Sequence, residues 1–471
     1  MKIFVKLFFL TIIICTQILA QKSIYGDWDG NIKMLSMNLN VHLNIRNSNN
    51  TLTAFLSIPS QELKDYQLPV FKLNKNKVHF ELPSPSGTAK FDGTFKSDSI
   101  KGTLLQAGIK GTFFFKRGIK QDTVTQTEII TDKPLPYLEE EVAFKSGRIL
   151  LAGTLTVPKD DNKYPAIILL TGSGPQNRDE DIFGFKIFQK IADYLTRKGI
   201  AVLRYDDRGV GGSTGNTMQS TTEDFADDAL AAVEFLKKQK NIDQKKIGFL
   251  GHSEGGIIAP LASSNSNDIS FMVLVSGFGV NGGELLLEQQ KQILKASDVK
   301  DTLIQQNLEL QKKINEVLMN NKDLNDIKKD IKDFAEKDFA NLSPDIKASI
   351  QDKVAYINST VQSQISVFNN PWFKFFVKYD PIPALEKVKI PVLMTFGEVD
   401  LQVPVAQNKP KMEEALQRGG NKNFKTIVFP KANHLYQEAK TGSPSEYSEL
   451  KKEFVPGFLE SISNWILEVI K

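Results

Sequence analysis

The sequence lacks the residues on which several kinds of site depend. Its one cysteine, Cys15, lies within the first twenty residues, so disulfides, thiol catalysis and cysteine metal sites are excluded from the rest of the chain. Beyond those residues no stretch is apolar for long enough to span a bilayer, and we expect no stable membrane insertion. The formal net charge of +4 is small and gives no indication of nucleic acid binding.

The first twenty residues combine a short basic start with an apolar run that begins at Leu7. This pattern is typical of a cleavable secretory signal, so residues 1–20 are predicted to be removed. Ile14 precedes Cys15, where a bacterial lipoprotein signal needs a small residue. We therefore expect an exported protein, either periplasmic or extracellular.

A change of pattern predicts more than one domain, as the length also suggests. In residues 21–118 apolar side chains alternate with polar ones, as at Val41, Leu43 and Ile45, which predicts a small antiparallel β domain. A polar stretch over residues 119–136 is predicted to be a linker.

From Tyr137 onward, strands alternate with helices, which indicates a mostly parallel sheet covered on both faces. We assign residues 137–281 and 379–471 to this α/β domain. Two edge strands are expected first, around residues 142–144 and 150–156. Helices are expected around residues 182–198, 223–240, 255–265, 405–418 and 449–470.

The segment 282–378 is too long for a bare loop between two strands. Its apolar residues recur at steps of three and four among Lys, Gln and Asp, as in amphipathic helices. Ser343 and Pro344 have the residue types of a helix start. We predict a helical cap that packs over the main domain, in preference to a coiled coil with a partner.

Gly251-His252-Ser253-Glu254-Gly255 lies between an apolar strand, Ile247 to Leu250, and a helix start rich in small residues. A strand that turns abruptly into a helix forces the central serine into a strained backbone conformation, and flanking side chains other than glycine would collide. The pattern predicts a nucleophile elbow that presents the hydroxyl of Ser253 above the sheet.

A serine hydroxyl needs a base that takes its proton, and histidine has a suitable pKa. The chain has four histidines. His42 and His79 fall in the β domain as ordinary strand residues, and the turn is expected to direct His252 away from Ser253. His434 follows the strand at 424–429, on a loop at the carboxyl edge of the sheet, and is the predicted base.

The imidazole in turn needs a carboxylate that fixes its tautomer. Asp400 lies immediately beyond the buried strand at 391–396, where the carboxyl ends of parallel strands converge. Glu398 is the rival at the same edge. Ser253, Asp400 and His434 follow one another in the order found in hydrolases.

The tetrahedral intermediate of acyl transfer carries an oxyanion that backbone N–H groups can stabilise. One donor is predicted at Glu254, directly after the serine, and the other at Ser173 in the turn Thr171-Gly172-Ser173-Gly174-Pro175. A glycine-rich turn can also bind phosphate, but no G-x-x-x-x-G-K pattern accompanies this one.

Residues 137–281 and 379–471 resemble a bacterial α/β-hydrolase of the carboxylesterase and serine-peptidase-like group. The resemblance rests on the elbow, on Leu170 to Asp179, Tyr205 to Ser213 and Tyr379 to Pro381, and on the segments around Asp400 and His434. It implies hydrolysis of small acyl esters through an acyl-Ser253 intermediate, with no metal or organic cofactor. It does not extend to the β domain.

Other interpretations stay open. The same triad would serve a peptidase or amidase, and an inactive hydrolase domain with a ligand-binding β domain is a third hypothesis. Asp207 and Arg208 are expected to pair and brace their loop. The aromatic run at 371–376 either lines an acyl pocket or packs the cap against the main domain.

Overall fold

The computed structural model describes residues 24–34, 37–48, 51–58, 63–83, 88–106, 109–118, 135–160, 162–342, 344–350 and 352–471. The predicted signal, 1–20, lies outside the described residues, as does nearly all of the predicted linker, 119–136. The export of the protein therefore stays a prediction. The chain divides into two compact units, Met1–Gln126 with Leu342–Ser359, and Thr127–Asn341 with Thr360–Lys471.

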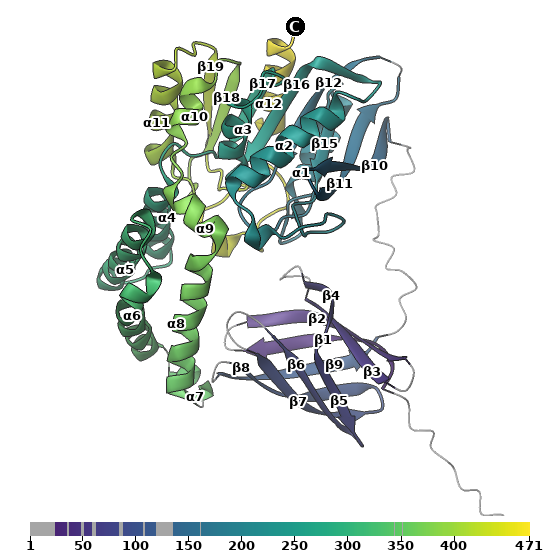
Figure 1. Ribbon diagram of the computed structural model, residues 1–471, viewed down its shortest axis with the longest axis vertical. Helices are drawn as coiled ribbons and strands as arrows, with labels where there is room; N and C mark the ends of the chain where they lie inside the picture. The colour runs from purple at the N-terminus through teal and green to yellow at the C-terminus, as the bar shows by residue number, and fades with distance from the viewer. Residues whose placement is uncertain are drawn as a thin grey trace, which may run out of the picture. The chain divides into compact units, whose positions relative to one another are not determined.

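The first unit is built on one antiparallel sheet with the strand order β4-β3-β2-β1-β9-β8-β7-β6-β5 (Figure 1). Its strands are β1 (Gly26–Met34), β2 (Met37–Ser48), β3 (Thr51–Ile58), β4 (Leu63–Gln67), β5 (Val70–Asn74), β6 (Lys77–Leu82), β7 (Ala89–Lys96), β8 (Ser99–Gln106) and β9 (Ile109–Arg117). Helix α7 (Pro344–Ser349) belongs to the same unit, in which Ile350 forms an isolated bridge with Ile109.

Aromatic side chains fill the core of the first unit. Phe80 stacks on Phe91 with ring centroids 4.3 Å apart, and Phe113 meets both rings edge-on. Trp28 is fully buried and donates a hydrogen bond to the carbonyl of Ile24. Apolar residues alternate with polar ones along these strands because one face of each strand packs into the core.

The second unit contains an eight-stranded sheet with the order β10-β11-β15-β12-β16-β17-β18-β19. Its strands are β10 (Tyr137–Ser146), β11 (Ile149–Pro158), β12 (Tyr164–Leu170), β15 (Ala201–Tyr205), β16 (Ile242–His252), β17 (Phe271–Val275), β18 (Val392–Gly397) and β19 (Phe424–Phe429). Strand β11 pairs antiparallel with both neighbours, and the pairs from β15 to β19 are parallel. The two predicted edge strands are β10 and β11. Only β10 lies at the edge of the sheet, because β11 pairs with β10 on one side and with β15 on the other.

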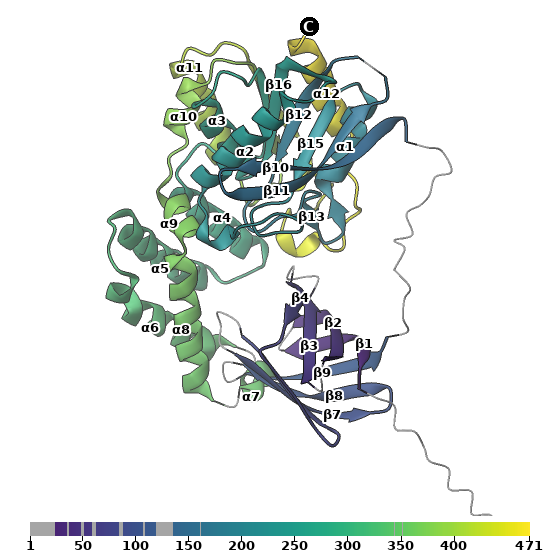
Figure 2. The ribbon, with the colours of Figure 1, turned by 45° about the vertical axis from the view of Figure 1, so that its right-hand side comes forward.

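Helices cover both faces of this sheet (Figure 2). On one face lie α2 (Thr222–Leu236), α3 (Gly255–Ser263), α10 (Ile382–Lys387) and α11 (Val405–Arg418). On the other lie α1 (Ile187–Arg197) and α12 (Phe458–Val469). The predicted helix at 449–470 begins only at Phe458, because Gly457 has a φ of +81° and Pro456 precedes it.

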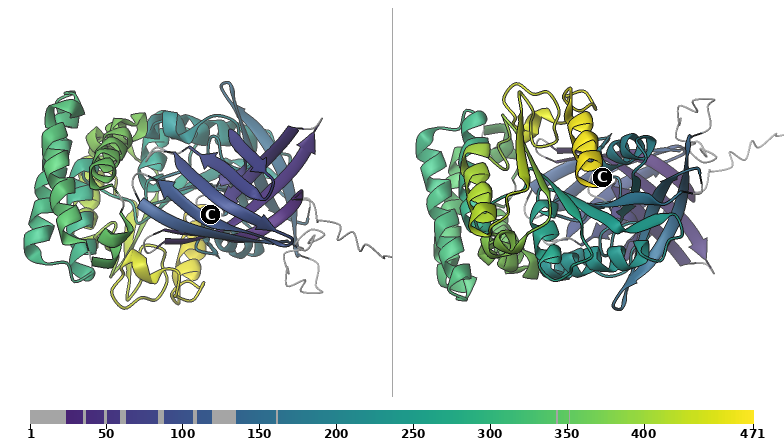
Figure 3. Two further views of the ribbon diagram at one scale, coloured as in Figure 1. Left: turned by 90° about the horizontal axis from the view of Figure 1, so that it is seen from below. Right: turned by 90° about the horizontal axis from the view of Figure 1, so that it is seen from above.

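The insertion between β17 and β18 is helical, as predicted. It comprises α4 (Gly282–Ala296), α5 (Asp301–Met319), η3 (Leu324–Ile327), α6 (Lys328–Asn341), α7, α8 (Lys353–Asn369) and α9 (Pro371–Lys378). Figure 3 shows α4, α5 and α6 standing beside the sheet of the second unit, outside its helix layers. Small elements complete the fold: the hairpin β13 (Asp181–Ile182) and β14 (Phe185–Lys186), η2 (Thr217–Gln219) and η4 (Pro444–Glu446).

The predicted fold class is confirmed: a mostly parallel sheet with covering helices and a helical insertion follows an antiparallel β unit. The domain boundaries drawn from the sequence stay predictions. Within the part of the chain that the structure describes, no helix combines the length and the apolar character needed to cross a bilayer.

Candidate active site

The turn from β16 into α3 places Ser253 in the left-handed region, with a φ of +54°. A Cβ atom at Gly251 would overlap the carbonyl of Gly255, and one at Gly255 would overlap that of Leu170. The turn therefore admits only glycine at these two positions, as the motif predicts. The N–H of Ser253 donates to the carbonyl of Val275 on the next strand, 2.9 Å away, which ties the turn to the sheet.

Asp400 and His434 meet at the carboxyl edge of the sheet. His434 Nδ1 lies 2.8 Å from Asp400 Oδ2, and both residues are buried. The other carboxylate oxygen accepts the N–H groups of Gln402 and Val403, which fixes the orientation of Asp400. Because Nδ1 donates to the carboxylate, Nε2 of a neutral His434 is the basic nitrogen.

The rival carboxylate is engaged elsewhere. Glu398 Oε2 accepts the backbone N–H of Lys431 at 2.9 Å and so braces the loop that leads to His434. Asp400 is thus the residue that the structure brings to the histidine.

The predicted oxyanion turn lies directly over the serine. A Cβ built on Gly172 would stand 3.4 Å from the Cβ of Ser253. The N–H of Gly172 is already used, because it donates to Glu180 Oε1 at 2.8 Å. Ser173 lines the same cavity as Ser253, and Glu254 precedes the first turn of α3, where backbone N–H groups have no partner within the helix.

The side chain of Glu254 connects the elbow with the cap. Its carboxylate accepts hydrogen bonds from Trp372 Nε1 on α9, at 2.9 and 3.0 Å, and from the hydroxyl of Thr222 at 2.8 Å. Burial raises the pKa of Glu254, while hydrogen bonds from Trp372, Thr222 and Ser173 oppose the rise. Trp372 therefore both lines the cavity and packs the cap against the elbow, which combines the two roles proposed for this aromatic run.

Ser253 and His434 line one cavity of about 360 Å³. Its wall on the side of the cap is mostly apolar and consists of Leu285, Leu286, Gln289, Trp372 and Phe376, and Phe278 lies next to them. Trp372 stacks on Phe376 with ring centroids 5.0 Å apart, and Phe278 meets Phe376 edge-on. Phe183, at the tip of the β13–β14 hairpin, is 63% exposed and also lines the cavity.

Three observations meet in the second unit. Its sheet has the strand order β10-β11-β15-β12-β16-β17-β18-β19. At one edge of the sheet lie Ser253, in a left-handed conformation between two glycines, and the hydrogen bond from His434 to Asp400. The second unit has the α/β-hydrolase fold. A family model described as "Serine aminopeptidase, S33" matches residues 185–336.

Two curated relatives show how far this likeness extends. Esterase EstD of Thermotoga maritima is 28% identical over 391 residues, which cover 81% of this chain and 79% of that protein. Dipeptidyl-peptidase 5 of Porphyromonas gingivalis is 29% identical over 149 residues, 30% of this chain and 21% of that protein. The stretch aligned with EstD is longer than the second unit, so the resemblance reaches into the β unit as well. This extends the likeness beyond what the motifs alone indicate.

Among solved structures, an esterase of Pyrococcus furiosus aligns with a TM-score of 0.43 at 16% sequence identity, over 75% of this chain and 95% of that chain.

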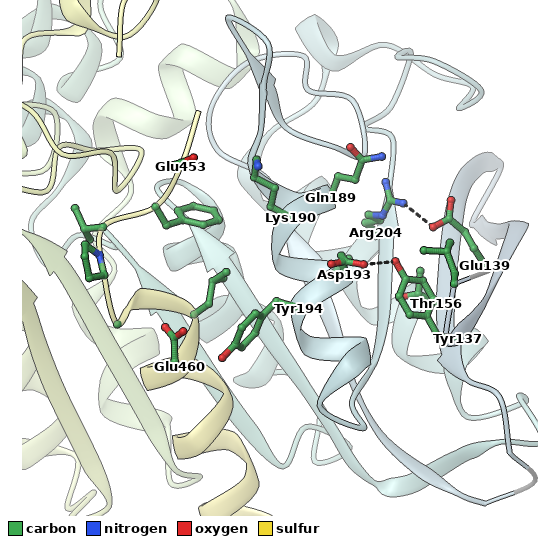
Figure 4. A pocket seen from close by; sticks show the side chains of 17 residues that line it. Tyr137, Glu139, Thr156, Gln189, Lys190, Asp193, Tyr194, Arg204, Glu453 and Glu460 are labelled. Atoms are coloured by element: carbon green, nitrogen blue, oxygen red, sulfur yellow. Dashed lines mark hydrogen bonds and ion pairs between the residues drawn. The ribbon is translucent and has the colours of Figure 1, made fainter. Parts of the chain in front are cut away.

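The hydrolase has a second, larger cavity of about 640 Å³ that lacks serine and histidine among its lining residues. Figure 4 shows two paired contacts in this cavity: Arg204 pairs with Glu139, and the hydroxyl of Tyr137 donates to Asp193 at 2.7 Å. The hydroxyl of Thr156 is bonded to that of Thr196. This cavity therefore offers no activated nucleophile, and the smaller one is the candidate active site.

Two residues of the hydrolase have partners other than those predicted. Arg208 binds Asp224 and Asp228 on α2, and Asp207 accepts from the hydroxyl of Thr171 and the N–H of Gln176. The predicted pair between Asp207 and Arg208 is therefore wrong. Each of the two residues braces the loop through other partners.

The sequence did not indicate Glu180 or the role of His252. His252 Nδ1 lies 2.9 Å from Glu180 Oε1, and its Nε2 lies 3.0 Å from the carbonyl oxygen of His434. Both side chains are buried in the wall of the catalytic cavity. The one available signal was the position of His252 beside the nucleophile. Among the described residues, no group of three or more His, Cys, Asp or Glu side chains is arranged to hold a metal ion.

Proposed function

We propose that this hydrolase cleaves small carboxylic esters through an acyl-serine intermediate. His434 takes the proton of Ser253 as the hydroxyl attacks the ester carbonyl, and Asp400 stabilises the imidazolium that forms. The backbone N–H groups of Ser173 and Glu254 bind the oxyanion. His434 then gives its proton to the departing alcohol and activates the water that releases the acid.

The observation that carries this proposal is the 2.8 Å hydrogen bond from His434 to Asp400 at the cavity that Ser253 also lines. A cavity of about 360 Å³ is near the lower end for small-molecule sites, and its wall at the cap is apolar and aromatic. Both properties suit a short or aromatic acyl group. The resemblance to EstD, over most of both chains, supports an ester substrate.

Cleavage of peptides is the second candidate, favoured by the serine aminopeptidase description of the matching family model and by the shorter likeness to a dipeptidyl-peptidase. An aminopeptidase needs an anionic group that receives the substrate ammonium. Glu180 is already paired with His252 and Gly172, and Glu254 with Trp372 and Thr222. The ester reading is therefore the better supported one.

Turnover of p-nitrophenyl esters of increasing acyl length, beside a panel of aminoacyl-p-nitroanilides, tests the proposal. We expect cleavage of the short esters, little cleavage of the anilides, and loss of turnover in Ser253→Ala. Ser448→Ala, a change at an exposed serine, is the matched control and should retain activity. Efficient cleavage of the anilides would favour the peptidase instead. Equal behaviour of wild type and Ser253→Ala would favour the inactive, ligand-binding hypothesis.

A further inference from the structure

Glu180 and His252 are two buried ionisable residues in the catalytic wall that the proposed mechanism does not use. Glu180 is 1% exposed and His252 is 3% exposed. Glu180 Oε1 receives two hydrogen bonds, one from the N–H of Gly172 and one from His252 Nδ1. The opposite ring nitrogen of His252 reaches the carbonyl of His434.

These contacts determine where the protons of His252 lie. A carbonyl oxygen can only accept, so Nε2 must carry a proton. An ionised carboxylate can only accept as well, so Nδ1 must carry the second proton whenever Glu180 is charged. Burial by itself lowers the pKa of His252, but the charge of Glu180 and the two hydrogen bonds outweigh it and raise the pKa. A charged Glu180 and a doubly protonated His252 therefore occur together.

The backbone of Glu180 adds an independent observation. Its φ of +45° lies in the left-handed region, which costs an ordinary residue about 1–2 kcal/mol. Glycine would avoid that cost, yet a glutamate with a buried side chain occupies the position. Strain of this kind persists where the surrounding structure requires the side chain, and it gathers at functional sites.

We propose that Glu180 and His252 form a positioning pair that holds the three catalytic segments of the site together. Glu180 holds the oxyanion turn through Gly172. His252, next to Ser253, holds the loop of the catalytic base through the carbonyl of His434. The pair links the donors, the nucleophile and the base through these hydrogen bonds. This inference rests on the proposed hydrolase function.

The pair matters for the rate because three separate loops must keep a common geometry. The Gly172 turn follows β12, Ser253 follows β16 and His434 follows β19, so the three groups lie on loops of three different strands. A misplacement of about 1 Å in a catalytic group can cost about 10²-fold in rate. Substrate binding in the cavity would be affected much less, since Glu180 contacts the protein itself.

Two substitutions of His252 each keep one of its two hydrogen bonds and remove the other. In His252→Asn the amide nitrogen can replace Nδ1 toward Glu180 but cannot reach His434. In His252→Gln the longer amide can replace Nε2 toward the carbonyl of His434 but leaves Glu180 without its partner. Glu180→Gln keeps an acceptor oxygen for both Gly172 and His252 but removes the carboxylate, whereas Glu180→Ala removes the acceptor as well.

The experiment measures kcat and KM for a p-nitrophenyl ester, with kcat expressed per serine that reacts with a fluorophosphonate. We expect Glu180→Ala and His252→Asn to lower kcat about 10²-fold with KM changed less than about twofold, and Glu180→Gln to recover most of the loss. His79→Asn, at an exposed histidine paired with Asp92, is the control and should match the wild type. Wild-type kcat per reactive serine in both damaging variants would overturn the proposal.

Ring protonation gives a second readout that does not depend on turnover. With only four histidines, nitrogen-15 histidine labelling gives a spectrum in which His252→Asn identifies the signals of His252. We expect Nε2 of His252 to be protonated in the wild type, and we expect Nδ1 to lose its proton at a lower pH in Glu180→Gln than in the wild type. An unprotonated Nε2 in the wild type, or the same titration of Nδ1 in both proteins, would overturn the pair. If the wild type cleaves no ester, the proposed function is wrong. The spectrum then tests by itself whether Glu180 and His252 form the proposed pair.

Discussion

At the scale of single residues, the hydrogen bond between Asp400 and His434 determines which nitrogen of the imidazole is basic. Asp400 is itself held by two backbone N–H groups, so the carboxylate cannot turn away from the ring. Glu398 lies two residues earlier, and its carboxylate accepts the backbone N–H of Lys431. The two carboxylates of one loop thus have different roles.

We predict that Asp400→Asn lowers kcat for ester hydrolysis by about 10⁴-fold with little change in KM. The amide can present N–H to the ring, which stabilises the wrong tautomer and removes the charge that supports the imidazolium. Steady-state kinetics on a p-nitrophenyl ester measures the effect. Glu398→Gln is the matched control and should retain most activity; a large loss there with a mild effect of Asp400→Asn would reverse the assignment.

We predict that the stability of the folded protein depends on pH through Glu254. Burial raises the pKa of Glu254 above its ordinary value of 4.5, so between these two pKa values the folded protein keeps a proton that the unfolded chain has released. The free energy of unfolding therefore falls as the pH rises through this window. Glu254→Gln cannot titrate and should show a smaller fall. Urea unfolding of both proteins across the window measures the difference, and parallel curves would contradict the assignment.

At the scale of elements, α9 is the part of the cap that reaches the nucleophile. Trp372 donates to Glu254, which is 118 residues away in the sequence, and stacks on Phe376 in the cavity wall. Its position at the start of the helix is fixed by Asn370, whose side chain accepts the N–H of Trp372, and by Pro371. One helix thus joins the elbow to the apolar wall of the cavity.

We predict that Trp372→Ala shifts the preferred ester toward longer acyl chains, because the loss of the indole enlarges the cavity next to Ser253. Trp372→Phe should keep the short-chain preference but destabilise the protein by about 1–3 kcal/mol, since Glu254 loses a buried donor. The p-nitrophenyl series and urea unfolding measure the two effects. An unchanged chain-length profile in Trp372→Ala would show that this wall does not contact the acyl group.

Local sequence patterns were enough to predict much of the candidate site. The elbow, Asp400 and His434 each follow a buried strand, and strand ends are readable from runs of apolar residues. Glu180 and Trp372 could not be found in that way, because their partners are 72 and 118 residues distant and no pattern of spacing records such contacts. The late start of α12 was missed because apolar periodicity continued through Pro456 and Gly457.

At the scale of the whole molecule, the two compact units have separate cores. The core of the first unit is aromatic, with Phe80 fully buried between Phe91 and Phe113. The proposed catalytic residues Ser253, Asp400 and His434 and the candidate active-site cavity belong to the second unit. Separate cores imply that each unit can lose stability by itself.

We therefore predict that Phe80→Ala destabilises the first unit by about 3–5 kcal/mol and leaves kcat for ester hydrolysis unchanged below its unfolding temperature. Calorimetry should show one transition moved to lower temperature and the other retained. Leu105→Ala, at a side chain that is 41% exposed, is the control and should move neither. If turnover falls in parallel with the first transition, the β unit supports catalysis directly.

The most direct test of the account is the site at which the protein reacts with diethyl p-nitrophenyl phosphate, an ester that leaves a stable adduct on an activated serine. Mass spectrometry of the digested protein should find one diethylphosphoryl group, on the peptide that contains Ser253, and His434→Ala should prevent its formation. An adduct on a different residue, or rapid labelling of Ser253 in the absence of His434, would contradict the proposed catalytic centre.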